Sequence, residues 1–318
     1  MTASARLLFY SVLSIHRQNH RDLHHFLPLS SGITATKTLC CRRRIRFSSQ
    51  MASGGMQAPT TSKQTMRLPN GEFFEISAAS GVSESEFRIA IESALFKQWL
   101  KNMQSEKGLL AGGQMHLRHV EVQGIDMFRN RIGFLKFKAE VFDKQTGMKV
   151  PGIVFARGPS VAVLILLESE EDTFVVLTEQ VRVPVGKLIL ELPAGMVDDE
   201  GGDVVGTAVR EVEEETGIKL NVQDMVNLTA FLDPTTSCKV FPSPGGCDEE
   251  LSLFLYKGKV KKEIIKALQG KEMGLRDHGE LIKVHVVPYD KLWRITSDAK
   301  ALSAVALYEM AKRDGLLL

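Results

Sequence analysis

The sequence predicts an α/β protein, an α/β/α sandwich on a mixed sheet that follows a small strand-rich domain. From residue 158 onward, strand-like apolar runs and helical segments interleave without a regular repeat, which favours a sandwich over a doubly wound sheet. Residues 115–157 instead form consecutive extended segments. We therefore expect a leader over residues 1–60, a first domain over 66–157 and a second over 158–318.

The first domain is expected to open with an amphipathic helix at residues 84–103. Its apolar side chains recur at helical spacing and are Phe87, Ala90, Ile91, Ala94, Leu95 and Trp99. Gly112 and Gly113 end this helical region. Beyond them, apolar residues such as Leu135 alternate with charged ones such as Lys136, which is typical of a half-buried strand.

The second domain is expected to contain five strands and three helices. The strands fall at 161–167, 174–178, 188–192, 251–256 and 282–287, and the helices at 203–217, 261–268 and 298–313. Asp203 is the expected N-cap of the first of these helices, and Gly217 is its expected stop.

Composition excludes several classes of protein. With 318 residues, 44% of them apolar and 25% charged, the chain has the composition of an ordinary globular protein of about two domains, which excludes a disordered or collagen-like chain. The longest apolar run, 161–167, has seven residues. A bilayer span needs roughly 20. We therefore expect a soluble protein with no membrane partner.

Charge is unevenly distributed along the chain. Residues 1–71 hold ten of the 40 basic residues and one of the 38 acidic ones, so the remainder carries 30 bases and 37 acids, a net charge of −7. An acidic folded part repels phosphate backbones, which predicts no nucleic-acid partner. A phosphate-bearing ligand would need a metal cation as mediator.

The leader is predicted to be a targeting segment. Residues 1–60 are rich in Ser, Thr, Arg and His and poor in acids, which is typical of an organellar transit peptide. A plastid is the expected destination, with the mitochondrion as the alternative; a disordered basic arm is the other interpretation. Outside the leader only Cys238 and Cys247 remain, and we expect free thiols, with a regulatory disulfide between them as the alternative.

Three glutamates of the helix at 203–217 carry the strongest chemical signal. Glu211, Glu214 and Glu215 stand at i, i+3 and i+4, so they share one edge of the helix. Like charges at this spacing repel by a few tenths of a kcal/mol, near a helix C-terminus that also disfavours anions. Arg210 would neutralise one of them, and Mg²⁺ or Mn²⁺ would suit the remaining oxygen ligands. The alternative is a solvated acidic helix face.

Residues 195–218 resemble the signature of the Nudix hydrolase superfamily, Gly-x5-Glu-x7-Arg-Glu-U-x-Glu-Glu-x-Gly-U, where U is aliphatic. Residues 210–218 match its second half at every position. In the first half, the spacing from Gly195 to Arg210 is one residue longer than the pattern, and Glu200 follows Gly195 after four residues instead of five. The loop before the helix is therefore expanded.

The resemblance implies roles for individual residues. Glu211, Glu214 and Glu215 would be metal ligands together with the main-chain carbonyl of Ala194, and Arg210 would orient the glutamates. The superfamily cleaves a nucleoside diphosphate linked to another group, and Mg²⁺ or Mn²⁺ would neutralise the diphosphate and activate a water.

Further segments are similar to the ADP-sugar diphosphatase branch of this superfamily. Residues 179–182 resemble its Glu-Gln-x-Arg, which implies that Arg182 contacts the diphosphate, as a guanidinium can in bidentate fashion. Residues 190–195 match the approach to the signature and add Glu191 as a substrate-binding candidate. Pro244 and Gly245 resemble the segment that marks ADP-sugar specificity, with Pro234 as a rival assignment.

The segment that begins at Glu280 suggests a further catalytic residue. Glu280 precedes a segment similar to the one whose mobile-loop glutamate positions the attacking water, whereas His285, within a strand, is expected to be packed or to face a partner. Phe134 and Phe137 are the two candidates for the aromatic residue that stacks on adenine, and the sequence does not choose between them.

The expected activity is metal-dependent hydrolysis of ADP-glucose or ADP-ribose to AMP and a sugar phosphate, by a homodimer in which the first domains exchange and contribute to the partner's site. With its leader, the chain resembles the plastidial enzymes of plants. The alternatives are a nucleotide sensor that has lost turnover and a hydrolase of oxidised nucleoside triphosphates.

Overall fold

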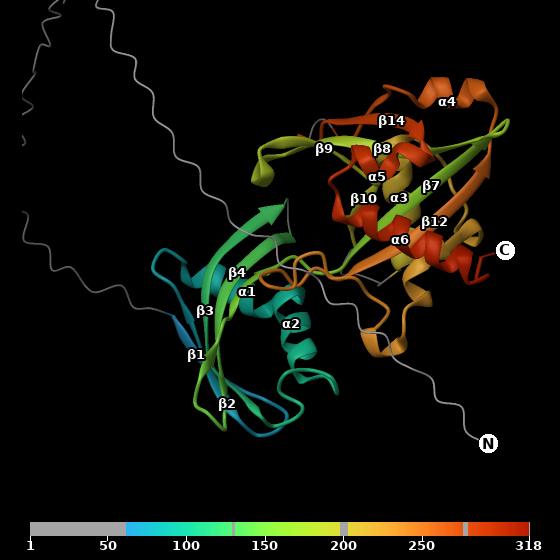
Figure 1. The fold of residues 1–318 in the computed structure, drawn as a ribbon. Coiled ribbons are helices and arrows are strands. Elements are labelled where there is room, and N and C mark those ends of the chain that lie inside the picture. The colour runs from blue at the N-terminus through green and yellow to red at the C-terminus, as the bar shows by residue number, and fades with distance from the viewer. Residues whose placement is uncertain (1–61, 129–130, 198–202, 276–278, 318) are drawn as a thin grey trace, which may run out of the picture. The chain divides into compact units, whose positions relative to one another are not determined.

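The structure is a computed structural model that describes residues 62–128, 131–197, 203–275 and 279–317 (Figure 1). The predicted transit peptide, the leader cysteines and Glu200 lie outside these residues. No helix in the described part of the chain has the length and apolar character needed to span a membrane.

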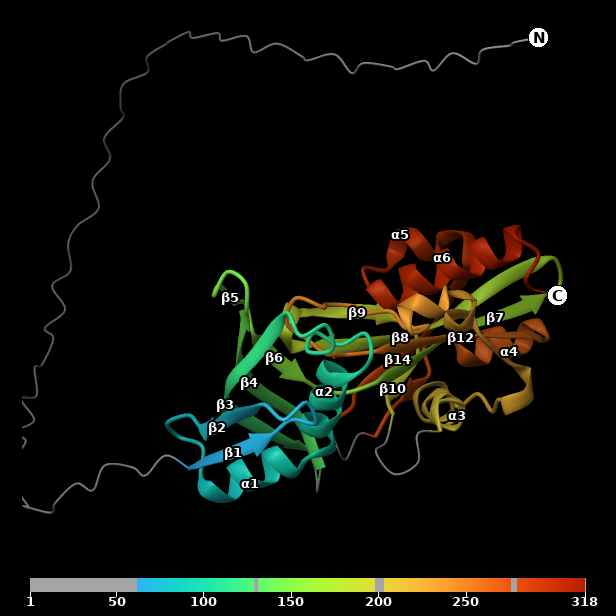
Figure 2. The ribbon, with the colours of Figure 1, turned by 90° about the horizontal axis from the view of Figure 1, so that it is seen from below.

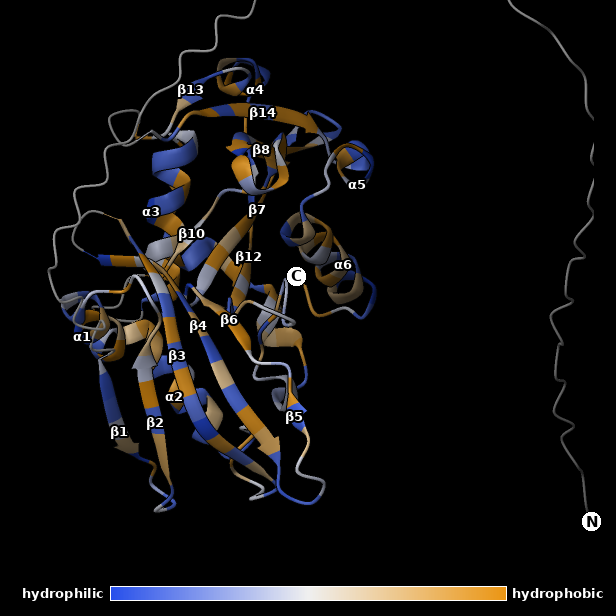
Figure 3. Ribbon diagram, turned by 90° about the vertical axis from the view of Figure 1, so that its left-hand side faces the viewer, coloured by the Kyte–Doolittle hydropathy of each residue, from blue (hydrophilic) through white to orange (hydrophobic). Residues whose placement is uncertain are grey.

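The first sheet has six strands in the order β1-β2-β3-β4-β5, with β6 paired to β4. The strands are β1 (Lys63–Arg67), β2 (Phe73–Ala78), β3 (Met115–Phe128), β4 (Arg131–Asp143), β5 (Lys149–Val150) and β6 (Ile153–Ala156). Only β2 and β3 pair in parallel. Polar and apolar residues alternate along β3 and β4 (Figure 3), as expected for strands with one buried face.

Two helices pack on the buried face of this sheet, α1 (Glu84–Glu92) and α2 (Ala94–Gln104). Their apolar side chains join those of the strands in one core, in which the rings of Trp99 and Phe137 lie 4.7 Å apart edge to face.

The prediction of one continuous helix over 84–103 is wrong at Ser93. This residue is extended, with φ −65° and ψ 151°. Its hydroxyl donates to the Ala90 carbonyl at 2.6 Å and lies 3.2 Å from the Phe96 amide, whose hydrogen bond it accepts. Local side-chain hydrogen bonds of this kind compete with the helical ladder, so Ser93 ends α1 and caps α2.

The second sheet has eight strands in the order β11-β12-β7-β8-β14-β13, with β10 paired to β7 and β9 paired to β8. They are β7 (Ser160–Ser169), β8 (Asp172–Arg182), β9 (Lys187–Glu191), β10 (Ala194–Met196), β11 (Met225–Asn227), β12 (Leu251–Lys259), β13 (Glu272–Met273) and β14 (Ile282–Pro288). The sheet is mixed because β7 and β12 run parallel while the other pairs are antiparallel.

Helices cover both faces of the second sheet. They are α3 (Val204–Thr216) and α4 (Lys262–Leu268) on one face, and α5 (Leu292–Ile295) and α6 (Ala299–Arg313) on the other. Figure 2 shows α3 and α6 on opposite sides of the strands. Short 3-10 turns connect the elements, namely η1 (Val183–Val185), η2 (Val222–Asp224), η3 (Leu228–Phe231), η4 (Pro234–Thr236) and η6 (Tyr289–Lys291). The predicted α/β/α sandwich with a mixed sheet is confirmed.

All five strands and three helices expected in this sandwich are present. The strands and the helix that the sequence did not predict are β1, β2, β10, β11, β13 and α5, of which β10, β11 and β13 have only two or three residues. A strand of two or three residues has too few positions to show alternation, so its place is decided by its neighbours in the sheet.

Candidate active site

Several of the predicted site residues lie at one end of the second sheet. The first residues of β7, β12 and β14 lie at this end, together with the last residues of β8. Ala194 of β10 pairs with Ala162, and Ile282 of β14 pairs with Gln180. Antiparallel and parallel pairings therefore bring together segments that are more than 100 residues apart in the chain.

Helix α3 is fixed against the sheet as the sequence predicts. Asp203 caps its first turn by accepting a hydrogen bond from the Gly206 amide at 2.9 Å. Ala208 and Val212 are fully buried on the face that packs on the sheet. Gly217 ends the helix at φ 73°, a left-handed conformation that suits glycine.

Glu215 is buried at the end of this helix. Its two carboxylate oxygens accept hydrogen bonds from the Gln180 side-chain amide at 2.9 Å and from the Ala194 backbone amide at 3.1 Å. Both donors are neutral. Burial, together with the nearby negative charge of Glu211, raises the pKa of Glu215 from 4.5 to about 8, against the lowering effect of its hydrogen bonds and of the charge of Arg182. A cation at this place would favour the ionised form.

Glu211 lies against the backbone of Gly195. A Cβ atom added to Gly195 would stand 2.1 Å from the Glu211 carboxyl carbon, so only glycine leaves room for this carboxylate. The guanidinium of Arg210 lies 3.1 Å from Glu211. The signature thus has glycine at position 195 for a steric reason: the side chain of Glu211, 16 residues later, occupies the space that a Cβ atom would need.

Glu214 occupies a different position from the other two glutamates. Its side chain is 36% exposed, and its carboxylate lies 3.4 Å from Arg210. Across residues 62–317, in the ranges that the structure describes, no three His, Cys, Asp or Glu side chains form a preassembled metal cluster. The fold brings Glu211 and Glu215 together at Ala194–Gly195 and leaves Glu214 beside Arg210.

The donor set at Ala194–Gly195 fits a hard divalent cation. The Ala194 amide points toward Glu215, and in a β-strand the carbonyl of the same residue points to the same edge. The carbonyl of the preceding residue, Pro193, is instead bonded to Val163 of β7. Carboxylate and carbonyl oxygens are the ligands that Mg²⁺ and Mn²⁺ prefer. Ala194, Glu211 and Glu215 are therefore the residues that would hold it.

Arg182 and Glu191 form an ion pair across the β8–β9 hairpin. The guanidinium binds the carboxylate in bidentate fashion, with N–O distances of 2.5 and 2.9 Å. Lys300 of α6 contacts the same carboxylate at 2.8 Å. Burial acts to raise the pKa of Glu191, but the two cations outweigh it and hold the pKa below its usual value. Glu191 thus faces two cations of its own chain.

Pro244 and Gly245 lie in an exposed turn whose far side pairs with the first sheet. The Gly246 carbonyl accepts a hydrogen bond from the Phe155 amide at 2.7 Å. Two residues further, Asp248 accepts from the Arg157 amide at 2.8 Å. The rival Pro234 is in η4, where its carbonyl accepts from Lys107. The segments that carry the two prolines are therefore bonded to different places, near β6 and after α2.

Glu280 is exposed in the loop between β13 and β14. Its carboxylate accepts a hydrogen bond from the Leu275 amide at 3.3 Å, within the same loop. Because Ile282 pairs with Gln180, the loop leaves the sheet at the end where Glu215 lies. His285 faces Glu179 across the strand pair at 3.7 Å and is mostly buried, which agrees with a packed histidine.

Among the two aromatic candidates, Phe137 is excluded as a base-stacking residue. Its side chain is fully buried in the first core. Phe134 is half-buried, and the Arg157 guanidinium lies 5.4 Å from its ring centre. Cys238 and Cys247 are both free thiols in the structure.

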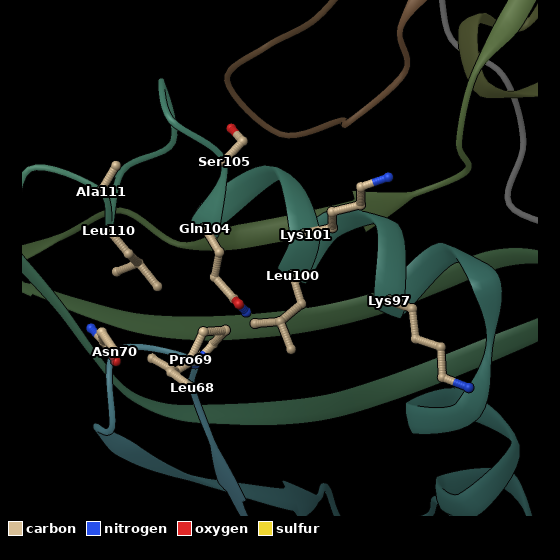
Figure 4. A pocket seen from close by; sticks show the side chains of 10 residues that line it. All are labelled: Leu68, Pro69, Asn70, Lys97, Leu100, Lys101, Gln104, Ser105, Leu110 and Ala111. Atoms are coloured by element: carbon tan, nitrogen blue, oxygen red, sulfur yellow. The ribbon is translucent and has the colours of Figure 1, made fainter.

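The cavity of about 550 Å³ drawn in Figure 4 lies beside the first sheet. It lies between α2 and the turn after β1, and Leu68, Leu100 and Leu110 line it. None of the predicted site residues borders it.

Sequence reasoning missed the partners that orient the predicted residues. Gln180 stood inside a recognised segment, but nothing in its spacing tied it to Glu215, 35 positions away. Lys300 is separated from Glu191 by 109 positions. The one signal in the sequence is that Lys300 comes two residues after Asp298, the N-cap of α6, so its position at the start of that helix could have been predicted.

Comparison with known proteins places the chain in one family. The NUDIX domain family matches residues 156–307. Nudix hydrolase 14, chloroplastic, of Arabidopsis thaliana is 65% identical over 256 residues, which are 80% of this chain and 83% of that protein. The ADP-ribose pyrophosphatase of Haemophilus influenzae is 32% identical over 181 residues, covering 54% of this chain and 74% of its own. A solved structure described as an ADP compounds hydrolase aligns with a TM-score of 0.43 and 18% identity over 64% of this chain and 96% of its own.

Proposed function

Because this chain belongs to the Nudix hydrolase family, we propose that it hydrolyses the diphosphate linkage of ADP-sugars, ADP-glucose or ADP-ribose, with Mg²⁺ or Mn²⁺. The products would be AMP and a sugar phosphate. The observation that carries the proposal is the pairing of Glu211 with Glu215 around Ala194–Gly195, at the sheet end where Arg182 also lies.

Each group at this end of the sheet has a task in the proposed reaction. Ala194, Glu211 and Glu215 would hold the cation, which when bound neutralises the diphosphate and lowers the pKa of a water. Gln180 and the Ala194 amide fix the Glu215 carboxylate, so it need not reorient during the reaction. Arg210 keeps Glu211 and Glu214 in place.

The remaining predicted residues would act on the substrate. Arg182 presents a half-exposed guanidinium suited to two phosphate oxygens. Glu280, in its loop at the same sheet end, would orient the attacking water. Pro244 and Gly245 would border the sugar or adenosine. The relative named an ADP-ribose pyrophosphatase supports this substrate class.

We further propose a homodimer in which residues 66–157 contribute to the partner's site, and a plastid location set by residues 1–60. The relative named as chloroplastic supports the location. Native mass spectrometry tests the assembly: a monomer at micromolar concentration would exclude domain exchange. Import into plastids of a fluorescent protein fused to residues 1–60 tests the proposed location.

The decisive experiment measures AMP release from ADP-glucose, ADP-ribose and an oxidised nucleoside triphosphate over a Mg²⁺ titration. We expect turnover of an ADP-sugar only with metal, and a loss of about 100-fold or more in Glu215→Gln, because one ligand oxygen is replaced by an amide. Glu213→Gln is the matched control: it stands on the same helix but pairs with Lys219 at 3.4 Å on its exposed side.

Two results would overturn the proposal. Preferred release of pyrophosphate from the oxidised triphosphate would assign the other hydrolytic class. Tight binding of ADP-sugars without turnover, in a wild-type protein loaded with Mg²⁺, would make the chain a nucleotide sensor.

A further inference from the structure

The Arg182 guanidinium is held along one edge and is free along another. Its Nε and one N–H of Nη2 donate to the two carboxylate oxygens of Glu191 at 2.5 and 2.9 Å. A guanidinium carries five N–H groups in a planar fork, so both N–H groups of Nη1 and the second N–H of Nη2 remain. Among the described residues, no other hydrogen bond or ion pair engages this guanidinium. An anion can therefore bind the second edge in bidentate fashion while Glu191 keeps its contact.

The two members of this ion pair differ in what a ligand can reach. The Arg182 side chain is 41% exposed, whereas the Glu191 side chain is 5% exposed. A substrate that arrives from solvent therefore meets the guanidinium and not the carboxylate. Glu191 was expected to bind the substrate, but its burial favours a role that acts through Arg182.

Residues at and before the start of α6 fix Glu191 in place. The Lys300 ammonium group contacts its carboxylate at 2.8 Å. The Thr296 hydroxyl donates to the carbonyl of the residue before Glu191 at 2.6 Å. Asp298, which caps α6, accepts a longer hydrogen bond of 3.4 Å from the amide of the residue after Glu191. Because both the backbone and the carboxylate of Glu191 are tied to α6, the guanidinium that it binds also has a defined position.

Arg182 lies on the face of β8 that borders the proposed cation site. Arg182 and Gln180 are two residues apart on this strand, so their side chains share one of its faces. Gln180 binds the Glu215 carboxylate at 2.9 Å. The charge of Arg182 also acts to lower the pKa of Glu215, which agrees with this proximity. A diphosphate bound to a cation at Glu215 would therefore lie near the guanidinium.

We propose that Glu191 is a positioning residue, which fixes the Arg182 guanidinium through Nε and Nη2 so that its Nη1–Nη2 edge faces the diphosphate of the substrate. The inference rests on the proposed function, because it requires Arg182 to bind the diphosphate. Glu191 does not touch the substrate, and its contact with Arg182 persists when the substrate binds. A long side chain held in its binding orientation beforehand needs less ordering when the ligand arrives.

The test is a double-mutant cycle between Glu191 and Arg182, measured as the Kd for ADP in calorimetry with Mg²⁺ and as KM for the ADP-sugar. Glu191→Gln should raise both about tenfold, with kcat changed less than about threefold. In an Arg182→Ala background the same change should alter Kd less than about threefold, because no guanidinium remains to be positioned.

The direction of the change separates orientation from charge. Glu191→Gln removes a negative charge close to the phosphate site, so electrostatics alone would strengthen the binding of ADP. Weaker binding that depends on Arg182 therefore indicates lost orientation. Tighter or unchanged binding in Glu191→Gln would overturn the inference. An equal loss in both backgrounds would also overturn it, because it would mark direct contact with the ligand or a packing role.

Glu309→Gln is the matched control. It removes the same charge from a carboxylate on α6 that accepts a hydrogen bond from Tyr289 in a part-buried position and contacts no site residue in the described contacts. Its Kd for ADP should stay within about twofold of wild type.

A measurement on the wild-type protein covers the case in which Glu191→Gln does not fold. In ¹H–¹⁵N spectra, the Nε–H signal of Arg182 is identified by its absence in Arg182→Lys. This signal should be protected from exchange with water both without ligand and with ADP and Mg²⁺, because Glu191 holds the Nε–H in both states. Loss of the protection on addition of ADP would overturn the inference.

These results also separate the inference from the proposed function. Wild-type protein that binds ADP but releases no AMP from an ADP-sugar overturns the function, while the ADP affinities and the Nε–H signal still decide the role of Glu191. Turnover of an ADP-sugar with unchanged Kd and KM in Glu191→Gln overturns the inference and leaves the function intact.

Discussion

Two glutamates, Glu191 and Glu215, are almost equally buried, but their pKa values are shifted in opposite directions. Glu191 is 4% exposed and Glu215 is 7% exposed. Glu191 meets Arg182 and Lys300, and its pKa lies below the usual value. Glu215 contacts two neutral donors and lies near the charge of Glu211, and its pKa rises to about 8 although the charge of Arg182 acts to lower it. Burial is common to both, so the partners decide the charge.

Glu191 therefore belongs to an ionic network that is complete within the chain, whereas Glu215 belongs to a site that still needs a cation. Glu191 is compensated by side chains of its own chain and needs nothing further to stay ionised. Glu215 accepts hydrogen bonds from two neutral donors, and the charge of Arg182 does not outweigh burial; a divalent cation is the partner that would reverse its pKa shift. A buried acidic residue marks a ligand site only where the protein does not itself supply the opposite charge.

Apart from the loss of Glu215 itself, the largest expected effect comes from displacing Glu211 beside it. In Gly195→Ala the new methyl group would stand 2.1 Å from the Glu211 carboxyl carbon and displace it. The displaced atoms are the end of a flexible side chain, so the melting temperature should change by less than about 3 °C. Activity should fall about 10- to 100-fold, by analogy with other changes around metal ligands. Mg²⁺ titrations of AMP release, beside melting curves, check both parts.

Gly112→Ala is a suitable control for that variant, since a Cβ there meets no atom within 4 Å. Unchanged activity in Gly195→Ala would mean that the position of Glu211 does not matter for the reaction.

A smaller effect should appear in the stability of the metal-free protein as pH changes. The pKa of Glu215 is higher in the folded state, about 8, than the ordinary 4.5 of the unfolded chain. Its contribution to stability is therefore complete below about pH 4.5 and is lost as pH rises toward 8, by a few kcal/mol at most. Chelated protein should melt at a lower temperature at pH 8 than at pH 5.5, and Mg²⁺ should raise the melting temperature more at pH 8.

Glu215→Gln should remove most of this pH dependence, whereas Glu191 should not contribute between pH 5.5 and 8. The depressed pKa of Glu191 places its loss of stability on the acid side, below the ordinary value for a glutamate. If the melting temperature of the chelated wild-type protein did not change between pH 5.5 and pH 8, the raised pKa of Glu215 would be contradicted.

The smallest effect is expected from the cap of the helix that carries Glu211 and Glu215. Asp203→Ala removes the hydrogen bond to the Gly206 amide and should lower the free energy of unfolding by about 1 kcal/mol. The cap is exposed and lies at the opposite end of α3 from Glu211 and Glu215. Urea unfolding should therefore show the loss, while kcat at saturating Mg²⁺ stays within about twofold. A large fall in kcat would show that the start of α3 couples to the site.

Much of the fold could be predicted because its signals are local. Long apolar runs and capped amphipathic helices such as α3 determine their own secondary structure. The break at Ser93 could not be predicted, because the apolar spacing continues across it. The short strand β10 was also missed, although it carries Ala194 and Gly195, because three residues show no period.

The sequence alone determined the α/β/α class, the helix with its acidic edge, and the signature that joins Gly195 to Glu211. Only the tertiary structure decided which glutamates lie close to each other and which contact a positively charged side chain. Glu215 faces Gln180 and Ala194, while Glu191 faces Arg182 and Lys300, across separations of up to 109 positions. Charge and spacing along a chain fix what a helix can present, but the pKa of a carboxylate depends on burial and on neighbours that only packing brings within a few ångströms.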